Sequence, residues 1–352
     1  MRKDIHINSY HNLIFSMVIF LTLQNVLVAF EKVGTTSFQF LKVMNEARAT
    51  SMGEAYTSVA QNSDAIFWNP AALTMISGNY DISISYTNWF LDSRHSSFSL
   101  AYKTDDGSVL GLMGLAVDMG YIEETTVRNL GFDENGVYNP GLTGEKLYIG
   151  AFGFGVAYAK NLTDKFSFGG LLKYVKEDLH YGDASSPIVD IGMLYRTGYR
   201  SIKIAATLRH FGPEVAFTQQ RDPELVPHTS SDSSETITGE GYPLPQTFNI
   251  GISANLISPE NSFLFSDSKH SLLASFDLIH PRDYDQQYGI GFEYGFMDVL
   301  FLRSGYKINY DEEGLCLGLG IRSNKYRFDY SYNDYGKYLG PINRFSIGRS
   351  LP

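Results

Sequence analysis

Charged side chains recur at alternate positions of otherwise apolar stretches, where acids and bases could pair with one another or line a polar passage. Those that we expect on one shared face are Lys173, Asp190, Lys203, Arg209, Asp277, Glu293, Arg303, Lys307, Arg327 and Asp329. Because buried charges require partners, pairing across an enclosed interior is the simpler interpretation. A polar passage or a ligand site is the alternative that the same residues permit.

Other kinds of chemistry find little support in the sequence. His180, His210 and His280 lie near expected strand ends, and the single cysteine, Cys316, can neither form an internal disulfide nor hold zinc alone. No G-x-S-x-G nucleophile elbow occurs, although a Ser-His pair is recognised by geometry and not by residue counts. We therefore predict no enzyme, no metal site and no cofactor.

Composition favours a membrane barrel. The net charge of −10 and the lack of a Lys/Arg-rich run argue against nucleic-acid binding. Charged residues make up 19% of the chain, below the roughly 25% of soluble domains. Beyond residue 30 no apolar run approaches the ~18 residues of a membrane helix. Abundant Tyr, Phe and Gly fit a barrel with a polar interior, and a soluble β-sandwich or propeller is the alternative.

The chain begins with the pattern of a signal peptide. Arg2 and Lys3 precede an apolar run from Leu13 to Leu23, and Ala29 offers a small residue for cleavage. A single membrane anchor is the alternative, but this run is too short to cross about 30 Å as a helix. We therefore expect residues 1–29 to be a signal peptide and the protein to be exported to the bacterial outer membrane.

Residues 30–78, which we call the hatch segment, follow a different residue pattern from the rest of the chain. Between residues 45 and 60, small side chains recur every fourth position, which predicts a short helix: Ala47, Ser51, Ala55 and Val59. Gly53 weakens that helix by about 1 kcal/mol relative to Ala. Because a small-residue helix can approach a wall closely, this segment could lie inside a barrel.

From residue 79 to residue 352 the period changes to two, which is typical of β-strands whose faces meet different surroundings. Leu317 and Leu319, for example, alternate with Gly318 and Gly320. Such runs mark about fourteen strands, most near the roughly 9–11 residues of a tilted membrane strand. Their expected cores are 79–88, 94–103, 108–118, 146–160, 165–178, 187–197, 201–211, 246–255, 270–280, 286–296, 298–308, 314–322, 325–333 and 342–350. The predicted fold is all-β: a transmembrane antiparallel β-barrel of about fourteen strands, with a short N-terminal helical hatch in its lumen.

Connection lengths support the barrel independently. An even strand count places both chain ends on the periplasmic side, where turns are short, and leaves long loops outside. The long connections 119–145 and 212–245 both fall outside, and only 256–269 is longer than a periplasmic turn should be. The proline-rich loop 212–245 has an acidic, serine-rich middle, so it is either a mobile solvated loop or an external contact surface.

Two stretches of the hatch segment also resemble a known family. Arg48-Ala-Thr-Ser-Met-Gly-Glu-Ala-Tyr56 and Asp64-Ala-Ile-Phe-Trp-Asn-Pro-Ala-Ala-Leu73 are similar to the N-terminal signature of PorV/PorQ-type proteins, which belong to the wider FadL-like outer-membrane barrels. The resemblance implies a hatch inside a 14-stranded barrel, with these residues in the hatch or at its junction with the first strand: Arg48, Gly53, Asp64, Phe67, Trp68, Asn69 and Pro70. Ala72 stands where the family usually has Gly, and the chain ends Ser350-Leu351-Pro352 instead of in an aromatic residue.

The resemblance implies two different functions, and a third remains open. PorV-like members take part in type IX secretion, so secreted cargo and other secretion-system components would be partners besides outer-membrane lipid. This is the function predicted first. FadL-like relatives move hydrophobic small molecules, which would need an apolar cavity lined by Phe67 and Trp68. A structural envelope protein without transport is the third possibility, because fold alone does not decide function.

Overall fold

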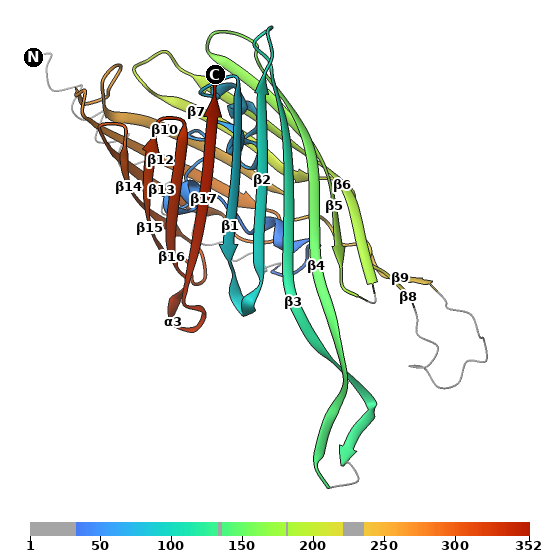
Figure 1. Cartoon of the computed structure of the whole chain (residues 1–352). Helices are drawn as coiled ribbons and strands as arrows, with labels where there is room; N and C mark the ends of the chain where they lie inside the picture. The colour runs from blue at the N-terminus through green and yellow to red at the C-terminus, as the bar shows by residue number, and fades with distance from the viewer. Residues whose placement is uncertain (1–32, 133–135, 181, 221–235) are drawn as a thin grey trace, which may run out of the picture. The chain divides into compact units, whose positions relative to one another are not determined.

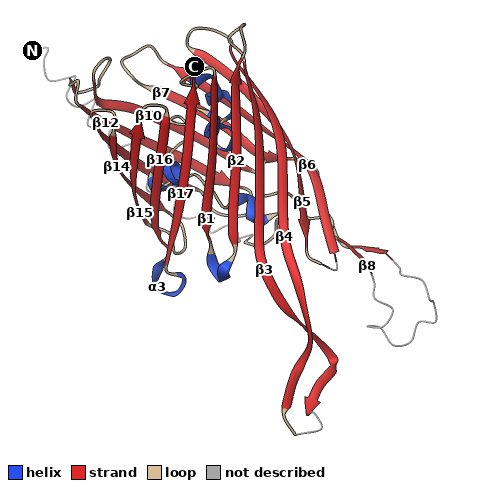
Figure 2. Ribbon diagram, in the orientation of Figure 1, coloured by secondary structure: helices blue, strands red, loops and turns tan. Residues whose placement is uncertain are grey.

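Fourteen antiparallel strands close into a barrel, because the first strand, β1, pairs along its whole length with the last, β17. This computed structural model describes residues 33–132, 136–180, 182–220 and 236–352, and the predicted signal peptide, 1–29, lies outside them. The all-β barrel fold is therefore confirmed (Figure 1 and Figure 2). Its strands are β1 (Tyr80–Asn88), β2 (Arg94–Lys103), β3 (Val109–Phe132), β4 (Tyr138–Asn161), β5 (Phe166–Asp178), β6 (Gly182–Arg196), β7 (Lys203–Phe211), β10 (Thr247–Ser258), β12 (His270–Pro281), β13 (Gln287–Phe296), β14 (Leu300–Ile308), β15 (Leu315–Ser323), β16 (Tyr326–Asp334) and β17 (Pro341–Leu351).

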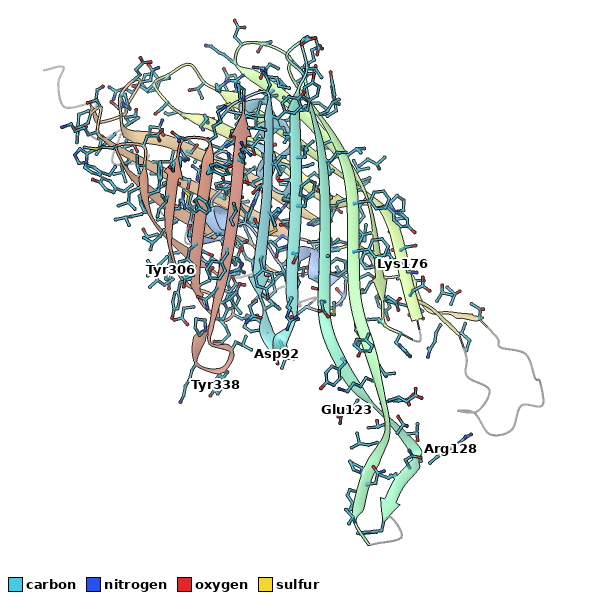
Figure 3. All side chains as sticks on the ribbon, viewed as in Figure 1. Asp92, Glu123, Arg128, Lys176, Tyr306 and Tyr338 are labelled. Atoms are coloured by element: carbon cyan, nitrogen blue, oxygen red, sulfur yellow. The ribbon has the colours of Figure 1, made fainter. Side chains whose placement is uncertain are left out.

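Each barrel strand presents an apolar face outward and a small or polar face to the lumen, as a period of two requires. On β15, Leu317 and Leu319 are 43% and 49% exposed, whereas Cys316 beside them is 1% exposed. Tyr306 of β14 likewise projects from the outer wall (Figure 3). A closed barrel leaves no unpaired strand edge, so this apolar outer band is a surface that a bilayer can cover.

The two ends of the barrel carry connections of different length. The terminal end, as we call it, has the short turns 104–108, 162–165 and 324–325, the longer connection with β11 (Phe265–Ser266), and Pro352. The hairpin end has the short strands β8 (Thr218–Gln220) and β9 (Thr236–Thr238), the helices η5 (Phe90–Asp92) and α3 (Gly336–Leu339), and the projecting parts of β3 and β4 (Figure 1).

The projecting parts of β3 and β4 correct one prediction. The connection 119–145 was expected to be a loop, but β3 and β4 continue to pair as far as Phe132 and Tyr138, beyond a register shift after Asp118. Alternation of apolar residues weakens at that point because neither face meets a core, whereas the backbone hydrogen bonds of the ladder continue. The result is a two-stranded ribbon that extends past the neighbouring strands, with Glu123 and Arg128 on it (Figure 3).

The hatch segment runs through the lumen from the hairpin end to the terminal end. The residues Gly34–Pro352 form one compact unit. At the hairpin end, Ser37 N donates to Pro243 O at 2.9 Å, and at the terminal end Asn79 N donates to Leu351 O at 2.9 Å. The helices of the hatch segment are η2 (Gln39–Lys42), α2 (Ala47–Ser51), η3 (Ser63–Phe67) and η4 (Pro70–Met75). No helix in the described ranges is long and apolar enough to cross a membrane.

The predicted helix across residues 45–60 is shorter than expected. It ends at Ser51, because Gly53 and Glu54 take φ values of +63° and +61°, the left-handed conformation that terminates helices. Ala55 and Val59 are buried nonetheless, in turns instead of on one helical face. Small side chains therefore lie against the wall as expected, but the regular spacing that suggested a longer helix does not reflect helical geometry.

Candidate functional site

Glycines on the lumen face of the wall let the hatch segment approach to backbone contact. A Cβ added at Gly291 would lie 2.5 Å from Met52 O, and one at Gly289 would lie 2.5 Å from Gly53 O, closer than real Cβ atoms approach. At Gly305 the added atom would fall inside the backbone of Met52 and Gly53. The predicted hatch residue Gly53 therefore contacts β13 and β14 backbone to backbone, an approach that only glycine permits.

A second contact region holds the later part of the hatch segment against β5 and β6. A Cβ at Gly169 would lie 2.5 Å from Pro70 C, and one at Gly192 would meet the Asn69 amide. Asn69 Nδ2 donates to a β6 carbonyl at 3.2 Å, while its Oδ1 caps η4. The resemblance predicts Asn69 and Pro70 at the junction with the first strand. Asn69 instead caps η4, Pro70 is the first residue of η4, and β1 begins only at Tyr80.

A chain of ion pairs joins the hatch segment to the wall. Arg48 donates to Glu293 from both Nε and Nη2, each at 2.7 Å. Glu293 also accepts from Arg303 Nε at 2.6 Å, and Arg303 Nη1 donates to Asp329 Oδ1 at 2.7 Å. The Arg48 and Glu293 side chains are only 9% and 7% exposed, so water screens their attraction little. The structure thus brings four of the predicted residues together in one network.

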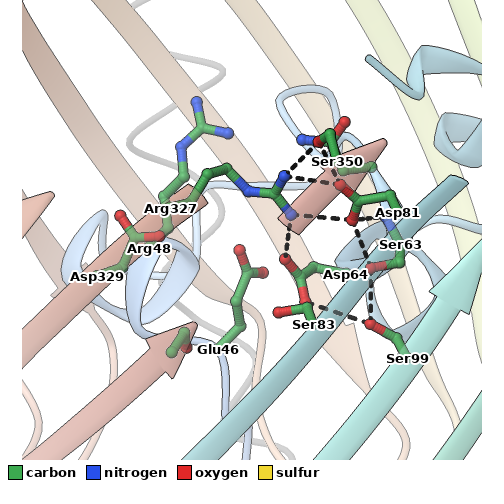
Figure 4. Close-up of polar contacts among 12 residues, drawn as sticks. Glu46, Arg48, Ser63, Asp64, Asp81, Ser83, Ser99, Arg327, Asp329 and Ser350 are labelled. Atoms are coloured by element: carbon green, nitrogen blue, oxygen red, sulfur yellow. Dashed lines mark hydrogen bonds and ion pairs between the residues drawn. The ribbon is translucent and has the colours of Figure 1, made fainter. Parts of the chain in front are cut away.

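Arg327 forms a second group of ion pairs, nearer the terminal end (Figure 4). Its Nη1 and Nη2 donate to the Asp81 carboxylate at 2.7 and 2.9 Å. Ser63 of the hatch segment donates to the same carboxylate from N at 3.0 Å and from Oγ at 2.6 Å. The predicted hatch residue Asp64 lies farther away, with Oδ2 3.8 Å from Arg327 Nη2. Because Asp81 takes both short bonds, Arg327 compensates the charge of Asp64 only weakly.

These two networks contain more acids than bases. Their carboxyl groups belong to Glu46, Asp64, Asp81, Glu293 and Asp329, and their guanidinium groups to Arg48, Arg303 and Arg327. Burial raises the pKa of Glu46 well above its ordinary value, and the nearby Asp64 raises it further. Burial also raises the pKa of Asp64 to about 6, against the opposing effect of Arg327. The carboxyls that lack a strong cationic partner are therefore both on the hatch segment, and both favour holding a proton.

We expect the hatch segment to be held more firmly at about pH 5 than at about pH 8. The pKa of Asp64 is raised from 3.8 to about 6, so its contribution to docking is complete below about pH 4 and is lost as the pH rises through 6. At about 1.4 kcal/mol per unit, the whole loss from below pH 4 to above pH 6 is on the order of 3 kcal/mol, and about half of it falls between pH 5 and pH 8. Amide hydrogen exchange across residues 45–68, corrected for intrinsic exchange rates, should show falling protection over this range.

An amide at position 64 provides the control for this pH dependence. Asp64→Asn should reduce it, because the amide does not titrate, whereas Asp105→Asn in the exposed turn 104–108 should leave it unchanged. The same pH dependence in D64N and in the unaltered protein would count against the assignment to Asp64.

The remaining predicted lumen charges also lie on the interior face. Lys307 Nζ pairs with Glu54 of the hatch segment at 2.6 Å and also with Glu313. Asp277 accepts from two backbone N–H groups of the hatch segment, at 3.1 and 2.8 Å. Lys203, Arg209 and Asp277 differ from the others, because none of them forms an ion pair with a described residue. Pairing across the lumen thus explains most, but not all, of these charges.

A bulge in β7 directs two consecutive side chains into the lumen. The pairing of β6 with β7 shifts between Val189 and Ile191, and His210 has a φ of +58°. Arg209 and His210 are consequently both 6% exposed, although strict alternation would place one of them outside. The period of two therefore predicts the position of Arg209 but not that of His210.

The bulge places His210 against a buried ion pair. Lys173 Nζ donates to Asp190 Oδ2 at 2.6 Å and lies 2.9 Å from His210 Nδ1. His210 N donates to Asp190 Oδ1 at 2.7 Å. Because His210 Nδ1 accepts from the ammonium group, its ring proton lies on Nε2. These contacts hold a non-glycine residue in a left-handed conformation, which is sparsely populated without such support.

A cavity of about 40 Å³ lies between the hatch segment and the wall formed by β2 to β5 and β7. One water needs ~10–15 Å³ of such space, so the cavity takes about three waters. Its apolar lining includes Leu41, Met44, Phe67, Trp68, Met113 and Leu171, and its polar lining includes Asn45, Glu46, Lys173 and His210. Phe67 and Trp68 thus border an apolar space between hatch and wall. No group of three or more His, Cys, Asp or Glu side chains in the described ranges could hold a metal ion.

The sequence prediction assigns no place in the lumen network to three residues of this site. Asp81 lies on the inward face of β1, and the alternation with its apolar neighbours Tyr80 and Ile82 was a signal that could have identified it. Glu46 belongs to the hatch segment, where neither strand nor helix periodicity assigns a face. His210 depends on the bulge, for which the sequence offers no glycine or other marker.

Comparison with known proteins finds similarity in structure but not in sequence. No family model matches the chain, and no curated protein matches it. The toluene transporter TbuX of Ralstonia pickettii has a TM-score of 0.55 at 13% identity, covering 89% of this chain and 99% of that protein. The monoaromatic hydrocarbon channel CymD has a TM-score of 0.56 at 11% identity, covering 87% and 97%. A Pseudomonas aeruginosa FadL homologue has a TM-score of 0.52 at 12% identity, covering 87% and 98%.

At such low identities these likenesses concern the fold alone. They agree with the FadL-like part of the predicted resemblance, whereas its PorV/PorQ part stays a prediction. The chain is a closed fourteen-stranded barrel whose fold is similar to that of the FadL homologue.

Proposed function

We propose that the protein is an outer-membrane channel that admits small hydrophobic molecules past the hatch segment. The observation that carries this proposal is the apolar cavity between the hatch segment and the wall, bordered by Phe67 and Trp68. Two observations support it. The outer face of the closed barrel is apolar, as a bilayer-spanning barrel requires. The fold is also that of proteins named as a toluene transporter and a monoaromatic hydrocarbon channel.

The cavity differs from the rest of the lumen in what it can hold. Elsewhere the hatch segment meets the wall through ion pairs, close glycine contacts and packed apolar side chains. An apolar solute in the cavity gains about 25 cal/mol for each Å² of apolar surface removed from water. Water gains less at the apolar part of the lining, because an ordered water needs several polar partners. A hydrophobic solute would therefore bind in the cavity, and its further passage through the barrel would require the hatch segment to move.

Filling the cavity should block uptake. Met113 lines the cavity and is 6% exposed. An indole at this position occupies the space that the solute needs, so Met113→Trp should lower uptake about tenfold or more. The measurement is uptake of radiolabelled toluene by an outer-membrane host that lacks such channels, compared with an empty-vector control.

The matched control is Leu112→Trp, on the same strand but 48% exposed on the outer face. It should transport like the unaltered protein. Uptake no greater than that of the vector control would exclude the channel function. Equal uptake by M113W and L112W would exclude the cavity as the route.

Secretion or surface attachment of cargo, the function predicted first, rests on the PorV/PorQ resemblance. One observation favours it: the ribbon of β3 and β4 projects from the hairpin end and exposes apolar side chains, with Val127 86% and Phe132 76% exposed. An unchanged set of secreted and surface proteins after loss of the gene would exclude this function.

A further inference from the structure

Three polar side chains that line the apolar cavity have atoms without a hydrogen-bond partner in the part of the chain that the structure describes. These atoms are Asn45 Oδ1, Glu46 Oε2 and Trp68 Nε1. The three residues are 7%, 5% and 1% exposed, so bulk water does not reach these atoms. Buried polar groups in folded proteins are nearly always hydrogen-bonded, and leaving one unpaired costs stability. A ligand that completes these bonds would therefore bind better than one that leaves them open.

Tyr56 holds two of these side chains in place. Its ring packs edge-on against Trp68 with the centroids 5.5 Å apart, and its hydroxyl donates to Glu46 Oε1 at 3.2 Å. The guanidinium of Arg209 lies 5.5 Å from the Trp68 ring centroid. These contacts limit rotation of both side chains toward other partners. The open donor of Trp68 and the open oxygen of Glu46 are therefore fixed features of the cavity.

The side chains that line the cavity carry no charge that lacks a partner. Lys173 is the cationic residue of the lining, and it is paired with Asp190 at 2.6 Å and bonded to His210. Burial raises the pKa of Glu46 well above its ordinary value, which favours the neutral carboxyl. Among the residues that line the cavity, a carboxylate ligand would find no free cation and an ammonium ligand no free anion, since Arg209, which packs on the Trp68 ring, is not part of the lining. The neutral carboxyl of Glu46 accepts from Tyr56 at Oε1 and therefore carries its proton on the open Oε2. A neutral hydroxyl, which both donates and accepts, fits the two open donors, Trp68 Nε1 and Glu46 Oε2, and the open acceptor, Asn45 Oδ1.

We propose that the cavity prefers apolar molecules that carry one neutral hydroxyl group, such as a phenol, over the same hydrocarbon without it. This inference rests on the proposed function and defines its substrate class more narrowly. The ligand oxygen accepts from Trp68 Nε1 and from the protonated Oε2 of Glu46, and the ligand hydroxyl donates to Asn45 Oδ1. The apolar body of the ligand packs against the remaining lining, which explains why the cavity is otherwise hydrophobic.

Toluene and p-cresol test this preference, because they differ only by the hydroxyl group. Both would be measured by equilibrium dialysis with the purified full chain in detergent, with M113W protein as the background for uptake by micelles. We expect p-cresol to bind about tenfold more tightly than toluene, since a site with unpaired polar groups discriminates against the ligand that cannot satisfy them.

Variants separate the hydrogen bonds from the hydrophobic contacts. Trp68→Phe removes the N–H but keeps an aromatic ring, and Glu46→Met removes the carboxyl but keeps the length. Each should lower the ratio of p-cresol to toluene affinity about threefold or more, because each removes one bond to the hydroxyl. Phe67→Leu alters the apolar lining alone and should weaken both ligands by similar factors. If W68F fails to fold, Asn45→Leu tests the open acceptor in its place.

The outcomes distinguish this inference from the proposed function. Equal affinity for toluene and p-cresol, or a ratio unchanged in both W68F and E46M, would overturn the hydroxyl preference and leave the channel function standing. Tightest binding of 4-methylbenzoate would overturn the preference for a neutral group. Binding of neither toluene nor p-cresol above the M113W background would overturn the proposed function itself.

Discussion

Replacing Gly305 with valine is expected to displace the hatch segment from β14 and to open the lumen to water. Any Cβ at this position falls inside the backbone of Met52 and Gly53, and neither can move aside as a flexible side chain would. Overpacking of an interior typically costs 1–3 kcal/mol, and a clash between backbones costs more. Ion conductance of the purified protein in planar bilayers should therefore rise about tenfold or more, as expected when a plugged lumen fills with water.

Gly114→Val is the matched control for Gly305→Val. Gly114 lies on β3, and the nearest atom to an added Cβ is Phe98 Cβ at 4.0 Å, so the extra volume is accommodated. This variant should conduct like the unaltered protein. Low conductance in G305V, together with unchanged protease resistance of the hatch segment, would show that the glycine contact does not determine its position.

The second large effect is expected from Glu293→Gln. Glu293 accepts from Arg48 at two atoms and from Arg303 at one, and the substitution leaves two buried guanidinium groups facing a neutral amide. Removing one partner of a buried ion pair costs about 3–5 kcal/mol. At about 1.4 kcal/mol for each factor of ten, amide hydrogen exchange of residues 45–57 should accelerate by about two to four orders of magnitude.

A double substitution tests whether the effect arises from unpaired charge. Arg48→Met in the E293Q background removes one of the two guanidinium groups, so the double variant should lose less stability than the sum of the single variants. Asp329→Asn, which removes one bond at a side chain 13% exposed, should have a smaller effect than E293Q. Additive losses in the double variant would indicate that Arg48 and Glu293 act independently.

The sequence predicts the barrel well because one physical rule governs most of it. A strand between lipid and lumen must alternate, so Leu317 and Leu319 identify β15 without any tertiary information. The same rule correctly assigns Glu293, Arg303 and Asp329 to the interior, where each finds an ionic partner.

The rule fails where the chain leaves that environment or departs from regular geometry. Beyond Asp118, β3 continues in the absence of a lipid face, so alternation no longer marks it. At His210 a bulge in β7 reverses which side chains face the lumen. At Gly53 a left-handed turn ends the helix, although the spacing of small residues predicts a longer one. The sequence also does not show which charges pair with each other, because ion pairs across the lumen join residues far apart in the chain, such as Arg48 and Glu293.

The contact of Gly53 with Gly305 has a kinetic consequence. Two glycine backbones have no rotamers to immobilise, so docking there costs little side-chain entropy. Dispersion attraction, however, falls by about a quarter to a half when a gap of about 0.5–1 Å opens. A small displacement of the hatch segment therefore loses much of this attraction, and positions between docked and undocked are sparsely populated. Permeation through the barrel would then depend on how often the hatch segment leaves its docked position, and not on how far it moves.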